Sequence, residues 1–162
     1  MPNLRNMTSI YLTYNDKILL LYRQGSKIVN NMWVSSAGGH FEEYELNNPK
    51  ACVLRELYEE LNISEELLNN ISLRYITLRY TQNEIRQNYY YFAELINIDR
   101  LTLSSNEGIL KWFSINELDV LDMPFSAKFV LQHWISKGRY TNEIYGGAAT
   151  ETNLIFTELF KS

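Results

Sequence analysis

Apolar, β-branched and aromatic residues gather in runs along this chain, and short polar segments separate the runs. The first two runs, 9–14 and 17–23, flank Asn15-Asp16, a residue pair typical of a two-residue hairpin turn. Residues of these types favour strands, because they pack well on a pleated, half-buried surface. The strands predicted from the pattern cover 9–14, 17–23, 32–37, 72–82, 87–96 and 109–113, and a final hairpin is predicted from 139–145 and 153–160.

The segment 50–61 repeats its apolar residues with the period of a helix. Asn48 and Pro49 suit the N-cap and the first helical position, and no Gly or Pro follows before residue 61. At about 100° per residue, one apolar stripe falls on a single face, which we expect to lie against the core. Its members are Leu54, Leu57, Tyr58 and Leu61.

Shorter helical signals occur later in the chain. Short helices are predicted at 64–68 and from Ser114, where the sequence has capping-box spacing. A longer helix is predicted to begin at Pro124 and to end at Gly138. Because strands and helices intermix, the pattern predicts an α/β fold with a mixed sheet between helices.

The composition is that of an ordinary globular chain, with 46% apolar and 21% charged residues in a length of 162. We therefore expect one domain over 1–162, with a C-terminal hairpin extension at 139–160. A net charge of −4 argues against a surface that coats nucleic acid. The one cysteine, Cys52, excludes an internal disulfide, suits a reducing compartment, and is expected to pack rather than act as a nucleophile. No segment approaches the roughly 20 apolar residues of a membrane helix, so we expect no membrane partner and a cytoplasmic location.

Three carboxylates crowd the polar face of the helix predicted at 50–61. Glu56, Glu59 and Glu60 lie opposite its apolar stripe, and Arg55 stands beside Glu59 at i+4 spacing. Like charges at these spacings repel, and a hard divalent cation would reverse that cost. Oxygen ligands favour Mg²⁺ or Mn²⁺ over zinc. The alternative is a solvated acidic face, since Glu is a good helix former.

A glycine turn upstream favours the metal site. Gly39 and Glu45, followed by Arg55-Glu56-Leu57, Glu59-Glu60 and Ile63, resemble the Nudix box, G-x5-E-x7-R-E-U-x-E-E-x-G-U, in which U is aliphatic. Two differences stand out: nine residues, 46–54, fill the second gap, and Asn62 takes the last Gly position. The extra pair fits in the loop before the helix, and Asn tolerates the left-handed conformation that ends a helix.

The resemblance implies a Nudix α/β/α sandwich and a metal-dependent hydrolase. Nudix enzymes cleave a nucleoside diphosphate linked to another moiety, by attack of water at phosphorus. Carried over from the box, the metal ligands are Glu56, Glu59, Glu60 and the backbone carbonyl of Gly38, with Glu56 or a neighbouring carboxylate as the base. Arg55 is expected to hold Glu59 in place, and Glu45 to support the loop or to contact a metal ligand.

A fourth carboxylate often joins the metal from outside the box, and Glu107 is our candidate. Glu107 followed by Trp112-Phe113 is similar to the arrangement in the branch that hydrolyses oxidised purine nucleoside triphosphates. Its alternative role is that of a turn residue, and Glu84 is a second candidate in a hairpin turn. Some members of that branch read the base with acidic residues just after a Met, whereas here Phe125, Ser126 and Ala127 follow Met123-Pro124.

Substrate contacts can only be proposed by residue type. Trp33, Tyr89, Tyr91 and Phe125 could stack on a nucleobase, and the alternative for each, favoured in a chain with 14% aromatic residues, is a core position. Arg23 and Lys27 could contact phosphates, or remain solvated cations.

These observations predict a pyrophosphohydrolase that depends on Mg²⁺ or Mn²⁺. The first substrate to consider is an oxidised or otherwise non-standard nucleoside triphosphate, cleaved to the monophosphate and pyrophosphate. ADP-ribose, dinucleoside polyphosphates and nucleotide sugars remain alternatives, because loops outside the box decide the substrate. A non-catalytic nucleotide-sensing module is the alternative from another class. The expected partner is a small nucleotide, and the terminal hairpin or exposed aromatic residues could form a homodimer interface.

Overall fold

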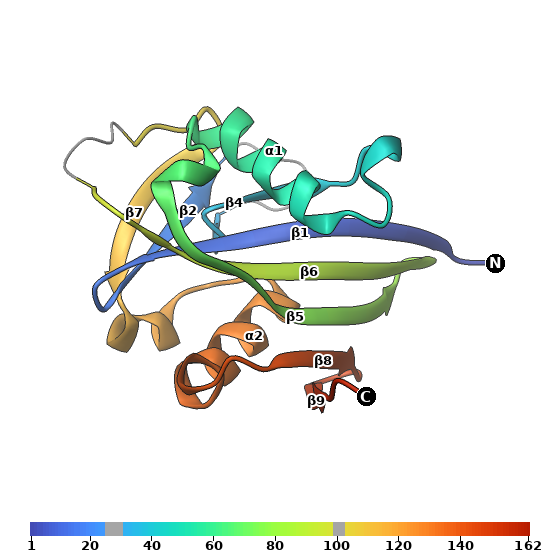
Figure 1. Ribbon diagram of the computed structural model, residues 1–162. Helices are drawn as coiled ribbons and strands as arrows, with labels where there is room; N and C mark the ends of the chain where they lie inside the picture. The colour runs from blue at the N-terminus through green and yellow to red at the C-terminus, as the bar shows by residue number, and fades with distance from the viewer. Residues whose placement is uncertain (25–30, 99–102) are drawn as a thin grey trace.

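The computed structural model describes residues 1–24, 31–98 and 103–162. A mixed β-sheet lies between two α-helices, α1 (Pro49–Leu61) on one face and α2 (Phe125–Ser136) on the other (Figure 1). This is the α/β/α sandwich predicted from the sequence. None of the helices in the described ranges is long and apolar enough to cross a membrane.

The strand order of the sheet is β3-β2-β1-β6-β5-β8-β9, while β4 pairs with β1 and β7 pairs with β2. The pairs β1·β6 and β5·β8 are parallel, and the others are antiparallel. The strands are β1 (Asn3–Tyr14), β2 (Lys17–Arg23), β3 (Met32–Val34), β4 (Ala37–His40), β5 (Leu68–Thr81), β6 (Glu84–Leu95), β7 (Gly108–Ser114), β8 (Ile144–Ala149) and β9 (Leu154–Leu159). Short 3₁₀ helices are η1 (Glu43–Glu45), η2 (Glu65–Leu67), η3 (Ile115–Val120) and η4 (Gly138–Tyr140).

Two hairpins turn on residues with a left-handed backbone. Asn15, with φ of 51°, connects β1 to β2 as predicted. Gln82 and Asn83 connect β5 to β6, with φ of 50° and 62°. Two successive positive φ angles, as at Gln82 and Asn83, are typical of a type I′ turn, which suits a two-residue hairpin. The loop predicted at 83–86 is therefore wrong, because Glu84 already lies in β6.

The strand predicted at 32–37 is broken into β3 and β4. The break is held by Ser36, whose hydroxyl donates to the carbonyl of Leu19 and accepts the amide N–H of Leu12 at 2.9 Å. The chain thus changes strand partners from β2 to β1, so that the glycines of β4 come to lie beside the middle of β1.

The C-terminal hairpin lies later in the chain than predicted. The strand predicted at 139–145 is wrong for most of its length, because η4 covers its start, 141–143 have no regular structure, and only 144–145 lie in β8. The cause is the buried Arg74 of β5, whose guanidinium donates to the backbone carbonyls of Gly138, Thr141 and Glu143 at 2.6–2.9 Å. These three carbonyls are thus satisfied by a side chain, outside a strand ladder. The antiparallel hairpin is formed instead by β8 and β9.

The two faces of the sheet bury different side chains, because neighbouring residues of a strand point to opposite sides. In β1, Ile10 and Leu12 pack with α1, whereas Tyr11 packs with α2. The α2 side is rich in aromatic rings, among them Phe92 stacked on Trp134 with ring centroids 4.8 Å apart. The sheet therefore carries one hydrophobic core on each face.

The ends of α1 are those predicted, but its buried face is rotated. The Asn48 side chain accepts the Ala51 N–H at 3.2 Å, and Asn62 ends the helix with φ of 55°. The prediction that Tyr58 is buried is wrong, since it is 59% exposed. The residues of α1 that are buried are Cys52, Val53, Leu57 and Leu61.

The rotation of α1 has a simple geometric cause. Tyr58 is roughly opposite Glu56 and Glu60 on the helix, at about 100° per residue. When Val53, Leu57 and Leu61 pack on the sheet, the row Cys52-Glu56-Glu60 turns toward β4 and Tyr58 turns toward solvent. Cys52 is buried as expected, with its Sγ 3.3 Å from the Thr8 hydroxyl.

Candidate active site

The Glu56 and Glu60 carboxylates stand over the glycines of β4. Both line a cleft of about 530 Å³, together with Gly38, Gly39 and Arg23. One helical turn separates the two glutamates, so their side chains lie on the same side of α1. The core packing of α1 therefore fixes where these carboxylates point.

Gly39 leaves the space that the Glu56 carboxylate occupies, and Gly38 lets β4 lie close against the backbone of β1. A Cβ on Gly39 would lie less than 3.0 Å from the carboxylate carbon and both oxygens of Glu56. A Cβ on Gly38 would lie less than 3.0 Å from the backbone carbonyl oxygen of Thr8, which cannot move without shifting β1. The N–H of Gly38 donates to Glu60 at 3.4 Å. Glycine is therefore needed at both positions, at Gly39 for the approach of the Glu56 side chain and at Gly38 for the approach of β1.

We expect Gly39→Ala to lower kcat about a hundredfold and to leave the fold intact. The Gly39 backbone suits any residue, and the three atoms nearest to the added methyl group all belong to the Glu56 carboxylate, which is displaced. A displacement of about 1 Å at a reacting group can cost about 10² in rate. Steady-state kinetics and thermal unfolding measure the two effects.

Gly146→Ala in β8 is the matched control, because its new Cβ would first meet a Leu159 methyl group at 3.3 Å. It should keep nearly full activity. Equal activity of the Gly39→Ala variant and the control would contradict the placement of Glu56.

Burial and mutual repulsion perturb both carboxylates. Burial raises the pKa of Glu60 to about 8, and the charges of Glu56 and Glu107 push it in the same direction, while the Gly38 N–H and Arg23 oppose them. Burial also raises the pKa of Glu56, against the hydrogen bond and charge of Arg55. Two crowded carboxylates with oxygen donors only are suited to a hard divalent cation.

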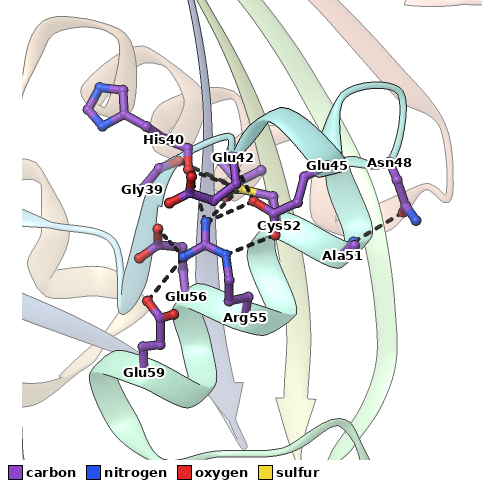
Figure 2. A network of polar contacts seen from close by, with 11 residues as sticks. Gly39, His40, Glu42, Glu45, Asn48, Ala51, Cys52, Arg55, Glu56 and Glu59 are labelled. Carbon is purple, nitrogen blue, oxygen red and sulfur yellow. Dashed lines mark hydrogen bonds and ion pairs between the residues drawn. The ribbon is translucent and has the colours of Figure 1, made fainter.

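Arg55 connects the glutamates of the site to the loop before α1 (Figure 2). Its Nε and Nη2 donate to the two oxygens of Glu45, both at 2.9 Å. Its Nη1 donates to Glu56 at 2.9 Å and to Glu59 at 3.0 Å. Its Nη2 also donates to the carbonyl of His40 at 3.1 Å. The predicted contact between Arg55 and Glu59 is confirmed.

The main partner of Arg55 is nevertheless Glu45, for which the sequence predicted loop support or a contact with a metal ligand. The Glu45 side chain is 1% exposed, and it also accepts the N–H of Glu42 at 2.8 Å. Its hydrogen bonds to Arg55 lower its pKa. The sequence did contain a signal for this pairing, because Glu45 and Arg55 both occupy fixed positions of the Nudix box.

Glu59 lies differently from the other two box glutamates. Its side chain is 56% exposed and bound to Arg55, and it is not among the described residues that line the cleft. No group of three or more His, Cys, Asp or Glu side chains within the described ranges is arranged to hold a metal ion. The structure brings together Glu56 and Glu60, and the role of Glu59 as a ligand stays a prediction.

Glu107 and Arg23 lie near the Glu60 end of the site. The Glu107 carboxylate is 3.9 Å from the Arg23 guanidinium and half-exposed, and its charge acts on Glu60. The Arg23 Nε is buried and has no hydrogen-bond partner among the described residues. A buried N–H without a partner is costly, and a bound anion would satisfy it.

The predicted aromatic residues lie outside the cleft lining. Trp33 packs edge-on against Phe113 with ring centroids 4.6 Å apart, Tyr89 packs on Phe41, and Phe125 lies beneath Arg79. Tyr91 is buried on the α1 side. Lys27 lies outside the described residues.

The cleft is lined instead by Ser9, Tyr11, Asn88 and Tyr90, beside Pro124 at the start of α2. Asn88 and Tyr90 were missed, although the alternation of β6 puts them on the face opposite Tyr89 and Tyr91. The alternation of side chains along β6 can be read from the sequence, but the sequence does not show which face of β6 lines the cleft.

The comparisons with known proteins agree with this geometry. The family model described as NUDIX domain matches residues 4–134. A mutator MutT protein from Bacillus halodurans is 20% identical, with a TM-score of 0.66 over 95% of this chain and 97% of that chain. An Ap4A hydrolase from C. elegans is also 20% identical, with a TM-score of 0.60 over 86% and 97%. No curated protein matches the chain.

The matched segment includes the glycines of β4, the whole of α1 and most of α2. At 20% identity, the solved structures establish the fold alone. The match to the family model covers most of the chain and includes the residues that form the cleft. The chain therefore belongs to the Nudix family and is a hydrolase of phosphorus-containing acid anhydrides.

Proposed function

We propose that this Nudix hydrolase cleaves a nucleoside triphosphate, oxidised or otherwise non-standard, to the monophosphate and pyrophosphate. The observation that carries the proposal is the pair of Glu56 and Glu60 carboxylates, packed against the glycines of β4 inside the cleft. Arg23, whose buried Nε lacks a partner among the described residues, lies in the same cleft and can bind a phosphate oxygen.

Each residue of the site has a separate task. Glu56, Glu60 and the carbonyl of Gly38 would hold Mg²⁺ or Mn²⁺, with Glu59 and Glu107 as further ligands. When bound, the metal neutralises the phosphates and polarises the bond to be broken, which is worth several kcal/mol. Glu56 or a neighbouring carboxylate accepts the proton of the attacking water. Arg55 positions Glu56, to which it donates at 2.9 Å.

The nucleoside would lie on the floor of the cleft. The Asn88 side chain offers an amide donor and a carbonyl acceptor, the two groups needed to hydrogen-bond the edge of a base. It exchanges hydrogen bonds with Ser9 at 3.2–3.3 Å, which fixes its orientation. These groups can bind a base without a carboxylate, in keeping with Phe125, Ser126 and Ala127 at the positions where some members of the oxidised-purine branch carry acids.

A hydrolysis screen with Mg²⁺ tests the proposal. Normal and oxidised nucleoside triphosphates, ADP-ribose, a nucleotide sugar and dinucleoside polyphosphates are compared, and the products are separated by chromatography. We expect turnover of a triphosphate with release of pyrophosphate. Turnover of ADP-ribose alone would contradict the substrate, and thermal stabilisation by a ligand without any turnover would indicate a sensing module.

A further inference from the structure

A second cleft lies on the α2 side of the sheet, away from Glu56 and Glu60. It has a volume of about 610 Å³, which suits a small metabolite. Ala127, in the first turn of α2, lines the active-site cleft, whereas Trp134, in the last turn, lines the second cleft. At about 1.5 Å of rise per residue, roughly 10 Å of helix separates these two positions. The two clefts therefore lie at opposite ends of α2.

Arg74 brings a buried positive charge to the wall of the second cleft. The residue is 7% exposed, and it forms no ion pair with any described residue. Its Nε donates to the carbonyl of Glu143 at 2.9 Å, and its Nη2 donates to the carbonyls of Gly138 at 2.6 Å and Thr141 at 2.8 Å. These carbonyls carry only partial charges. A buried cation without an anionic partner is costly, and a bound anion would remove that cost.

The Nη1 atom of Arg74 is the part of the guanidinium that is open to the cleft. The hydrogen bonds of Arg74 to described residues use Nε and Nη2 alone. Among the described residues, the one fully buried side-chain nitrogen without a partner is Nε of Arg23, so Nη1 of Arg74 is in contact with solvent. Because Arg74 lines the cleft, the free N–H groups of Nη1 are presented there in a fixed orientation.

The other charged groups of the second cleft leave it positive. Arg139 of η4 is exposed, and in the described part of the chain its guanidinium contacts only the side chain of Tyr140. Glu94 of β6 is the one carboxylate in the described lining, and it pairs with neither arginine. Two guanidinium groups thus face one carboxylate, in a chain whose net charge is −4.

We propose that this second cleft binds a small molecule through a carboxylate or phosphate group, which Arg74 and Arg139 hold. Planar guanidinium groups with free N–H donors bind both of these oxyanions through paired hydrogen bonds. The bound group supplies the counter-charge that Arg74 lacks. Glu94 weakens the binding of a ligand that is only anionic, because like charges repel. The inference is independent of the proposed function, since neither arginine lines the active-site cleft.

The first test is an NMR titration of the isotope-labelled, metal-free protein with inorganic phosphate and, separately, with succinate. The ionic strength is held constant with KCl. We expect saturable shifts of the amide signals of Ser72 and Asn142, which line the second cleft. The amides of Gly38 and Gly39 report separately on the active-site cleft. Saturation with phosphate, with succinate or with both supports the proposal and identifies the oxyanion. Shifts confined to Gly38 and Gly39, or shifts that grow linearly with concentration, would overturn it.

Three variants test the charges of the second cleft, with Kd measured by the same titration. Arg139→Gln should raise the Kd about fivefold, as expected for the loss of an exposed charge-assisted hydrogen bond. Glu94→Gln should lower the Kd about threefold, because the repulsion of the anion is removed. Lys137→Gln is the matched control and should leave the Kd unchanged, since Lys137 is exposed and is not among the described lining residues.

An equal rise in Kd for Arg139→Gln and Lys137→Gln, or no fall for Glu94→Gln, would indicate general attraction of anions and overturn the proposal. Arg74 is left intact, because it also holds the segment after α2. Thermal unfolding identifies a variant that does not fold. If Arg139→Gln fails in this way, the opposite sign expected for Glu94→Gln still decides the test.

Discussion

Glu60→Gln is expected to abolish turnover while the metal-free protein becomes no less stable. The substitution removes one carboxylate from the pair that would hold the metal, and we expect kcat/KM to fall about a thousandfold or more, or roughly 4 kcal/mol of barrier. The same carboxylate is unfavourable for folding, because burial and Glu56 raise its pKa to about 8. Catalysis and stability should therefore change in opposite directions.

The pH dependence of the metal-free protein follows from the same pKa. A carboxyl group whose pKa is 4.5 when unfolded and about 8 when folded binds its proton more tightly in the folded state. Its contribution to folding is full below pH 4.5 and is lost as the pH rises toward 8. Glu60→Gln should flatten this decline, because an amide does not titrate.

Thermal unfolding between pH 5 and pH 8, either in a chelator or in Mg²⁺ without chelator, measures these effects. Glu66→Gln is the control, since Glu66 is an exposed glutamate on the segment after α1. Wild type and control should be stabilised by Mg²⁺, and Glu60→Gln much less. Full activity of Glu60→Gln, or a metal-free melting temperature well below that of the wild type, would show that Glu60 is a structural residue.

The parts of the site that the sequence predicted correctly are those encoded locally. Asn48 and Asn62 define the ends of α1 through contacts within four residues, so their role can be read from residue type and spacing. The Arg55–Glu59 contact is likewise a property of one helical turn. Local geometry also explains why the two extra residues before the helix did not disturb it.

The parts that the sequence did not predict depend on long-range register. Nothing near β6 in the chain indicates that Asn88 and Tyr90, rather than Tyr89 and Tyr91, face the cleft. That choice is made by the pairing of β6 with β1 and by the helix that covers each face. Arg5 and Arg86 likewise become neighbours only through this pairing. The position of η4 depends on Arg74, more than 60 residues earlier.

Arg55→Ala is expected to be the most destabilising single change in the site, by about 3 kcal/mol or more near neutral pH. It leaves the Glu45 carboxylate, 1% exposed, buried without a cation, and loss of one partner of a buried ion pair typically costs about 3–5 kcal/mol. Activity should fall as well, because Glu56 and Glu59 lose their common donor. Arg55→Lys should lose less stability than Arg55→Ala, because a positive charge remains beside Glu45. It should still be less stable than the wild type, because lysine cannot form the paired hydrogen bonds to Glu45.

The pH dependence of this loss distinguishes a buried ion pair from simple packing. The pKa of Glu45 is lowered below 4.5 in the folded state, so its contribution is present above pH 4.5 and is lost as the pH falls further. The difference in unfolding free energy between wild type and Arg55→Ala should therefore shrink below about pH 4.5, as urea titrations at several pH values would measure. Lys50→Ala is the control, because Lys50 and Glu65 form an ion pair with both side chains about half-exposed, and its loss should cost under about 1 kcal/mol. A loss for Arg55→Ala that is small, or that stays constant down to pH 3, would mean that the loop before α1 is held by packing and not by the Glu45 charge.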